Sequence, residues 1–324
     1  MFISILKTSV KEKSDMNKKA YFYIDDVIWL FRDLTRKRPA SLFDNPFIKA
    51  LKDAHDKYGV KTQLNVFCRT DYFYGNDEFM LSEMTDAYKD EWESASSWLK
   101  LAFHAKQEYP DYPHVNAKYE DVKAIYEYTK REIYRFAGEK SFTTAITPHW
   151  LPMSYDAIRA LYDCGVRLCN CSFGNREEYN GDPASLPYGH ALRLLNNRQP
   201  ETQTFTRKTR DTAISRSICA YNHITEEQSE KTLRSLDTVK DDKTGMHFKR
   251  LCNSVILNLT PYDELESDFA PHLENEFVGA GTHEQYFYEE YLAYQPDYAD
   301  KILKMGEILK SNGYTFIFAD EIVE

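Results

Sequence analysis

Polar side chains that could take part in catalysis stand where short apolar segments of this sequence end. They are Asp25, Asp26, His104, His149, His283 and Glu284. If the apolar segments are strands of a parallel barrel, their carboxyl ends meet at one face, where the loops that carry reactive groups lie. We therefore expect distant parts of the chain to bring these side chains into one site.

Asp25 and Asp26 place two carboxylates side by side between two apolar stretches, residues 21–24 and 27–30. Two neighbouring carboxylates in a partly buried cleft cannot both stay ionised cheaply unless a cation or hydrogen-bond donors offset their repulsion. A bound metal ion is the simplest compensation. The alternative is a solvated turn in which one aspartate caps the backbone.

His104 is followed by Glu108 four residues later and by His114 ten residues later. Together with Asp26, these residues offer the mixed nitrogen and oxygen ligands that Zn²⁺ or a similar first-row ion accepts, and they leave one position for water. The spacing leaves both Glu108 and His114 open as the third protein ligand.

Composition and charge exclude several classes of function. The formal net charge of −10 disfavours nucleic acid as a partner, since phosphate binding needs a basic surface and the only basic run is residues 36–38. No apolar stretch approaches the roughly 20 residues needed to cross a bilayer. The apolar residues 2–6 are too few for a signal peptide, and the six cysteines form no C-x-x-C pair. We therefore expect a cytoplasmic protein with reduced thiols.

The elements that position these side chains follow from an alternation of apolar segments with amphipathic ones, which is typical of β-α units around a parallel sheet. Strands are predicted at residues 21–25, 60–68, 99–103, 142–147, 166–171, 255–259 and 314–318. Helices are predicted at residues 45–59, 84–96, 119–136, 154–165 and 298–309. Of these helices, the first should begin at Asn45 with Pro46 in its first turn and end at Gly59.

The pattern predicts an α/β fold in which a distorted parallel barrel, similar to a TIM barrel, occupies a single domain over residues 1–324. The more polar residues 174–250 carry turn signals such as Asn180-Gly181 and are interpreted as an irregular insertion within that domain. Residues 1–18 show no pattern that would pair them with the rest and are expected to form an N-terminal tail.

At the strand ends the sequence resembles the polysaccharide deacetylase family, which has the NodB-homology fold of carbohydrate esterases. Residues 23–26, Tyr-Ile-Asp-Asp, resemble its first motif, Thr-Phe-Asp-Asp, and Phe103-His104 resembles the start of its second motif, His-x-x-x-His. Its closing pattern, a histidine, a helix and Gly-Tyr-x-Phe-Val, is matched by His283 and residues 313–317, Gly-Tyr-Thr-Phe-Ile. The likeness spans most of the chain except the insertion.

This resemblance implies a barrel of the (β/α)7 type and the hydrolysis of an acetamide or ester on a sugar. It implies that Asp25 is the catalytic base and His283 the catalytic acid. It implies a divalent metal, expected to be zinc, held by Asp26, His104 and either Glu108 or His114. Contacts to a carbohydrate substrate are expected from His149, Trp150, Glu284, Trp29 and Tyr286, with Tyr72 as a further ring.

The sequence departs from the family pattern in three places. Glu108 stands where the second motif has its second histidine, residues 147–150 lack the arginine of the third motif, and Val27 replaces a glycine. Two other functions therefore stay open: glycoside cleavage by Asp25 with Glu284 or Glu108 as the acid and base pair, and carbohydrate binding without catalysis. Metal dependence distinguishes the deacylase from both. No pattern in the sequence specifies the sugar or an oligomeric state.

Overall fold

The structure, a computed structural model, describes residues 17–70, 78–108, 113–114, 117–151, 153–170 and 232–323. Its strands are β1 (Lys19–Val27), β2 (Thr62–Phe67), β3 (Leu99–Ala105), β4 (Ala145–Ile146), β5 (Leu168–Asn170), β6 (Val239–Lys240), β7 (His247–Lys249), β8 (Phe277–His283) and β9 (Thr315–Phe316). Its α-helices are α1 (Trp29–Lys37), α2 (Pro46–Tyr58), α3 (Lys89–Ala95), α4 (Tyr119–Ala137), α5 (Tyr155–Asp163), α9 (Leu265–Phe269) and α10 (Tyr298–Ser311).

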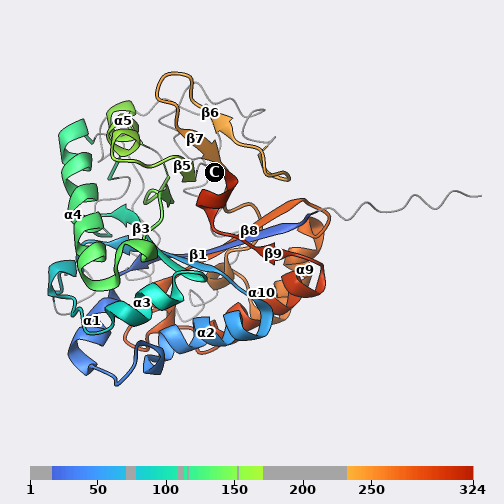
Figure 1. Ribbon diagram of the computed structural model, residues 1–324. Helices are drawn as coiled ribbons and strands as arrows, with labels where there is room; N and C mark the ends of the chain where they lie inside the picture. Colours follow the sequence, from blue (N-terminus) through green and yellow to red (C-terminus); the bar gives the residue numbers. More distant parts are fainter. Residues whose placement is uncertain are drawn as a thin grey trace, which may run out of the picture.

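The strands form two sheets that are almost entirely parallel (Figure 1). The first has the order β3-β2-β1-β8, and β9 pairs with the beginning of β1. The second has the order β4-β5-β7-β6, in which β6 is antiparallel to β7 and the other pairs are parallel. The α/β class with a parallel sheet, predicted from the alternating pattern, is confirmed.

The two sheets meet on both sides and form a distorted barrel. On one side, Leu101 of β3 makes a parallel bridge to Phe142, which lies shortly before β4. On the other side, the segment after β7 runs along β8, where the backbone N–H of Ser254 donates to the Gly279 carbonyl and that of Gly281 donates to the Val255 carbonyl. The carboxyl ends of β1, β3, β4 and β8 consequently face a common region.

The helix α2 shows how local sequence sets the boundaries of these elements. The side-chain oxygen of Asn45 accepts hydrogen bonds from the N–H groups of Phe47 and Ile48, at 3.0 and 3.2 Å, and Pro46 stands in the first turn. Gly59 ends the helix with a φ of 73°, in the left-handed region that suits glycine. These boundaries are those predicted from the sequence.

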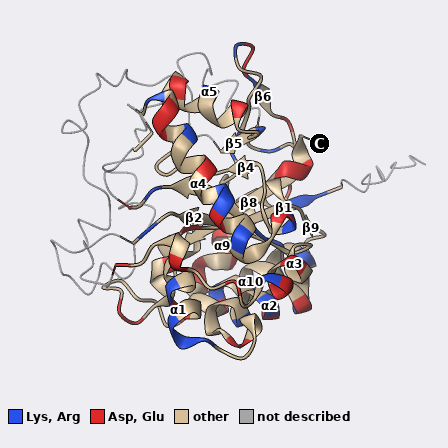
Figure 2. Ribbon diagram, turned by 60° about the vertical axis from the view of Figure 1, so that its left-hand side comes forward, with Lys and Arg blue, Asp and Glu red and all other residues tan. Residues whose placement is uncertain are grey.

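Helices cover the outside of the barrel and pack large aromatic rings against it. Phe31 of α1, Trp92 of α3 and Phe136 of α4 pack together, with ring centroids 5.2 Å apart for Phe31 and Phe136 and 6.2 Å for Phe31 and Trp92. Figure 2 shows Lys and Arg beside Asp and Glu on outer helices such as α4 and α5. Among the described residues, no helix has the length and apolar character that crossing a bilayer requires.

Several predicted elements differ from the structure. The strand expected at residues 255–259 is wrong, because the chain makes one bridge to β8 at Ile256 and then turns into the short 3-10 helix η7 (Leu257–Leu259). The helix expected at residues 84–96 is limited to α3. Neither α1 nor β8 was predicted from the sequence, and the glycines Gly279 and Gly281 interrupt the apolar pattern of β8.

Most of the predicted insertion, residues 174–231, and most of the predicted tail, residues 1–16, lie outside the described residues. The described end of the insertion includes β7, whose residues His247, Phe248 and Lys249 pair in parallel with β5. This end of the segment therefore contributes β7 and its antiparallel partner β6 to the second sheet.

Candidate metal centre

The paired aspartates sit on an irregularity in β1. Ile24 is opposite Leu64 and Val27 is opposite Val66 on β2, so β1 carries one extra residue at Asp25–Asp26. Asp26 has a φ of 65°, an uncommon conformation for a residue other than glycine. Successive side chains of a regular strand point to opposite faces, whereas this bulge lets both carboxylates approach His104.

His104 occupies a matching irregularity in β3. Val66 is opposite Phe103 and Phe67 is opposite Ala105, so His104 is the extra residue there. Its side chain is 2% exposed, with Nε2 at 3.1 Å from Asp26 Oδ1 and Nδ1 at 3.9 Å from Asp25 Oδ1. The two bulges thus direct three polar side chains into the barrel mouth.

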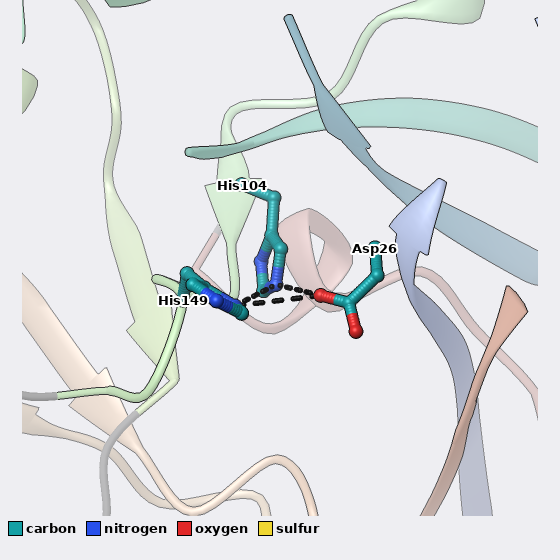
Figure 3. Close-up of side chains that lie close together, drawn as sticks. All are labelled: Asp26, His104 and His149. Carbon is teal, nitrogen blue, oxygen red and sulfur yellow. Dashed lines mark hydrogen bonds and ion pairs between the residues drawn. The ribbon is translucent and has the colours of Figure 1, made fainter. Parts of the chain in front are cut away.

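His149, in the loop after β4, completes a group of three possible ligands with Asp26 and His104. Its Nδ1 lies 3.0 Å from His104 Nε2 and 3.4 Å from Asp26 Oδ1. Figure 3 shows the two ring nitrogens and the carboxylate oxygen pointing toward one another. All three side chains are buried, and among the described residues these are the ones grouped closely enough to hold an ion.

Backbone carbonyls determine which nitrogen of each imidazole carries a proton. His104 Nδ1 donates to the Thr147 carbonyl at 2.5 Å, and His149 Nε2 donates to the Glu108 carbonyl at 3.0 Å. In the neutral rings, His104 Nε2 and His149 Nδ1 therefore carry lone pairs, and these are the two atoms that face Asp26. Such second contacts commonly orient histidine ligands of metal ions.

Electrostatics favours the same protonation states. Burial, with the nearby charge of His149, lowers the pKa of His104, so that its ring is neutral at neutral pH. Burial acts to raise the pKa of Asp26, but the contacts of its carboxylate with the His104 and His149 rings hold that pKa well below its usual value. Asp26 is therefore a carboxylate that faces two imidazoles.

These three groups fit a divalent cation. Three lone pairs that converge within 3.4 Å repel one another unless a proton or a cation lies among them. Metal–ligand bonds of about 2.0–2.1 Å in tetrahedral geometry place ligand atoms about 3.3 Å apart, close to the separations found here. Two imidazole nitrogens and one carboxylate oxygen are also a ligand set that zinc accepts.

The loop that carries His149 is strained. Trp150 and Leu151 have φ values of 64° and 72°, in the left-handed region that large side chains rarely adopt. Such residues cost of order 1–3 kcal/mol each and persist where the surrounding structure enforces them, often at functional sites. With Asp26, three strained residues other than glycine lie in or beside this group.

Glu108 and His114, the two residues predicted as the third ligand, lie beside the group of three. His114 Nε2 is 3.1 Å from the His104 carbonyl, and burial lowers the pKa of His114 to about 4. The backbone carbonyl of Glu108 accepts a hydrogen bond from His149 Nε2, and the Glu108 carboxylate lies 4.0 Å from the same nitrogen. The structure therefore puts His149, predicted as a substrate contact, where the sequence suggested Glu108 or His114.

Asp25 and His283, the predicted base and acid, face each other as paired residues of β1 and β8. The Asn65 side-chain amide donates to Asp25 Oδ1 at 2.7 Å. His283 Nδ1 lies 3.0 Å from Asn258 Oδ1, which also accepts from the Thr282 hydroxyl at 3.1 Å. The two residues thus border the group of three from the neighbouring strand ends.

Glu284 has a structural environment that does not suit the predicted substrate contact. It is fully buried, and its two oxygens accept hydrogen bonds from the backbone N–H groups of Ile28, Trp29 and Leu30 at 2.7–2.8 Å. Burial raises its pKa to about 7, although these three N–H groups act in the opposite direction. Glu284 therefore caps the N-terminus of α1, whose own N-cap residue, Ile28, offers no side-chain acceptor.

The aromatic residues predicted to contact a sugar divide into two groups. Trp29 and Tyr286 are 2% and 1% exposed, and Trp29 packs edge-on against Tyr288 and Tyr291, so these rings belong to the core. Trp150 is half-buried, with its ring centroid 5.8 Å from that of His149. Trp150 can still border a substrate, whereas Tyr72 lies outside the described residues.

No family model and no curated protein matches the sequence. Among solved structures, the 4-alpha-glucanotransferase from Thermococcus litoralis aligns with a TM-score of 0.51 and 10% identity, over 95% of this chain and 40% of that one. A family 4 acetyl xylan esterase from Clostridium thermocellum, solved with a cobalt ion, aligns at 0.40 and 13% identity, over 94% and 90% of the two chains.

A glycoside hydrolase/deacetylase from Parabacteroides distasonis aligns at 0.46 and 9% identity, over 95% of this chain and 71% of that one. This chain spans less than half the length of the glucanotransferase. At such identities the likeness concerns the fold. The chain thus has an α/β fold similar to part of the glucanotransferase structure, with a buried Asp/His/His group that could bind a metal ion.

Proposed function

We propose that this protein is a metal-dependent hydrolase that removes acyl groups, such as acetyl, from a carbohydrate. The observation that supports this proposal most is the convergence of His104 Nε2, His149 Nδ1 and Asp26 Oδ1 at the carboxyl ends of three strands. The N–H group of each histidine ring donates to a backbone carbonyl away from the centre. Two ring nitrogens and one carboxylate oxygen are thus left as ligand atoms for one cation, proposed to be zinc.

The roles of the surrounding residues follow from their positions. When bound, a divalent ion polarises an acyl oxygen and lowers the pKa of water. Asp25, 3.9 Å from His104, would accept the proton of the attacking water. His283 donates Nδ1–H to Asn258, so Nε2 is the nitrogen that would protonate the leaving amine or alkoxide. Trp150 would border the sugar.

Glycoside cleavage is the alternative that the name of the similar glucanotransferase suggests. That reaction needs two carboxyl groups that reach the sugar from opposite sides. Glu284 is unsuited to this role because both of its oxygens accept backbone hydrogen bonds in the core. Glu108 stays possible as a partner of Asp25, and binding without catalysis would retain the same cleft. Both alternatives predict activity or binding without a metal ion.

Metal analysis of the purified protein tests the proposal. We expect about one divalent ion per chain, with loss of the ion in His149→Ala and retention in His114→Ala. Hydrolysis of N-acetylated chitooligosaccharides or O-acetylated xylo-oligosaccharides should stop after chelation and return when Zn²⁺ is added. A metal-free protein that cleaves glycosidic bonds would establish the first alternative. Equal metal content in wild type and His149→Ala would reject the ligand set.

A further inference from the structure

The carboxylate of Asp25 is held by a chain of two buried amides on β2. Asn65 Nδ2 donates to Asp25 Oδ1 at 2.7 Å, and Gln63 Nε2 donates to Asn65 Oδ1 at 2.8 Å. Gln63 Nε2 also donates to the Ala145 carbonyl of β4 at 3.0 Å. Because Gln63 and Asn65 are two residues apart, they lie on one face of β2, and the contact to β4 shows that this face is the barrel interior.

The two ends of this chain determine the direction of each hydrogen bond. The Ala145 carbonyl can only accept, so the Gln63 group next to it must be the NH₂ group. The second hydrogen of that NH₂ group then meets Asn65 Oδ1, which turns the NH₂ group of Asn65 toward Asp25. If both amides were flipped, oxygen would face oxygen at Ala145 and at the carboxylate.

Burying these two amides leaves one polar atom unpaired, and this energetic cost indicates that the amides have a functional role. Gln63 and Asn65 are fully buried, and Gln63 Oε1 has no hydrogen-bond partner among the described residues. Leaving such an atom unpaired is unfavourable in a protein interior. The Gln63 oxygen stays unpaired while the two NH₂ groups bond to the Ala145 carbonyl, to Asn65 Oδ1 and to Asp25 Oδ1.

We infer that Asn65, oriented by Gln63, is the positioning residue of Asp25 in the proposed reaction. In the deacetylase family that the sequence resembles, an arginine of the third motif orients the base, but residues 147–150 contain none, and His149 of that segment joins the possible ligands. A neutral amide from β2 then replaces a cation from another loop. It fixes the rotation of the carboxylate without adding a positive charge beside the proposed metal ion.

This inference rests on the proposed function, and kinetics of the full-length metal-loaded protein test it. Asn65→Leu keeps the branched shape and the number of side-chain heavy atoms but removes the donor, and Gln63→Leu removes the group that orients it. We expect kcat to fall about 10- to 100-fold in Asn65→Leu, with KM for an N-acetylated chitooligosaccharide within twofold of wild type and one metal ion retained per chain. Gln63→Leu should show a smaller loss of kcat with the same pattern.

Asn45→Ala is the matched control, since it removes a buried asparagine that only caps α2. Its kcat should equal that of wild type even though the protein is less stable. The inference is overturned if Asn65→Leu keeps wild-type kcat, or if its loss of activity is accompanied by loss of the metal ion, which would indicate general disruption of the site. An inactive wild-type protein would instead overturn the proposed function, and the inference with it.

Discussion

The conformation of Asp26 explains how two consecutive aspartates serve one site. Its positive φ and the extra residue in β1 turn its carboxylate toward His104 and His149, while Asp25 stays within reach of Asn65. The same pair in a regular strand would point one carboxylate into the barrel and the other away from it. The bulge thus separates two roles between chemically identical neighbours.

Isosteric substitutions should show this separation of roles. Asp26→Asn keeps a residue that tolerates a positive φ but removes the charge, so we expect the affinity for Zn²⁺ to fall at least tenfold. Asp25→Asn should lose activity and keep the ion. Zinc affinity, measured by competition with a chelator, and metal content, measured by elemental analysis, check both variants. Equal zinc affinities for the two variants would contradict the division of roles.

The origin of His149 shows why the ligand set was only partly predictable. Asp26 and His104 were predicted as ligands because they end strands and resemble a motif. His149 also ends a strand, but its turn toward Asp26 depends on the Glu108 carbonyl and on the strained residues after it. Contacts between distant loops leave no mark in local spacing, so the sequence pointed to Glu108 and His114, which follow His104 closely.

At the scale of elements, β8 shows how packing can hide a strand from sequence patterns. A Cβ atom at Gly279 would overlap the carbonyl oxygen of Leu251, and one at Gly281 would overlap the ring of Tyr23. The backbone after β7 can approach β8 because Gly279 lacks a side chain, and Gly281 leaves room for the Tyr23 ring of β1. The glycines that allow the barrel to close therefore also remove the apolar alternation by which a strand is predicted. In contrast, the caps of α2 are local and were predicted correctly.

Gly279→Ala should consequently damage the fold. The overlapping atom belongs to the backbone and cannot move aside, so we expect a loss of more than about 3 kcal/mol in the free energy of unfolding, or failure to fold. Gly59→Ala is the comparison, because no atom lies within 4 Å of its added Cβ and only its φ of 73° is unfavourable. It should cost about 1 kcal/mol in the same urea titration. Similar losses in both variants would show that β8 can shift.

The cap that Glu284 provides links β8 to the segment directly after Asp26. In Glu284→Gln one oxygen becomes an NH₂ group that cannot accept from Ile28 or its neighbours, so we expect a loss of roughly 1.5–3 kcal/mol in stability. Because Ile28 is two residues from Asp26, metal affinity should also fall. Glu266→Gln, the same substitution at an exposed carboxylate that pairs with Lys304 on the surface, should change stability by less than about 0.5 kcal/mol. Urea unfolding and zinc competition measure both effects.

At the scale of the whole molecule, the barrel was predictable because alternation of apolar and amphipathic segments is a property of the entire chain. The strand β1 at its centre pairs with β2 and β8, which are far apart in sequence, and the candidate site lies where their carboxyl ends meet. Which polar residues face the centre depended on bulges in β1 and β3. Each bulge reverses the side of the sheet to which the following side chains point. The positions of these bulges could not be predicted from the composition of the strands.

The barrel also buries ionisable groups, which makes its stability depend on pH. His114 titrates at about pH 4 in the folded protein and near 6.5 when unfolded, so between these values the unfolded chain binds a proton that the native protein does not. This difference lowers stability as pH falls from 6.5 to 4. Glu284 acts in the opposite sense, since its pKa is raised to about 7 and its contribution falls as pH rises from 4.5 to 7.

Because these two contributions oppose each other, the pH dependence of the wild-type unfolding free energy does not separate them. The difference in unfolding free energy between wild type and a variant that lacks His114 isolates the contribution of this residue. His114→Gln keeps an N–H donor for the His104 carbonyl and removes the titration. The stability advantage of wild type over this variant should therefore shrink by roughly 2–3 kcal/mol between pH 7 and pH 4.5, as urea unfolding of the metal-free proteins would measure. An advantage that stays constant over this range would mean that His114 has the same pKa in the native protein as in the unfolded chain. In that case the pocket around His104 would be open to water, and the desolvation that lowers the pKa of His104 would be lost with it.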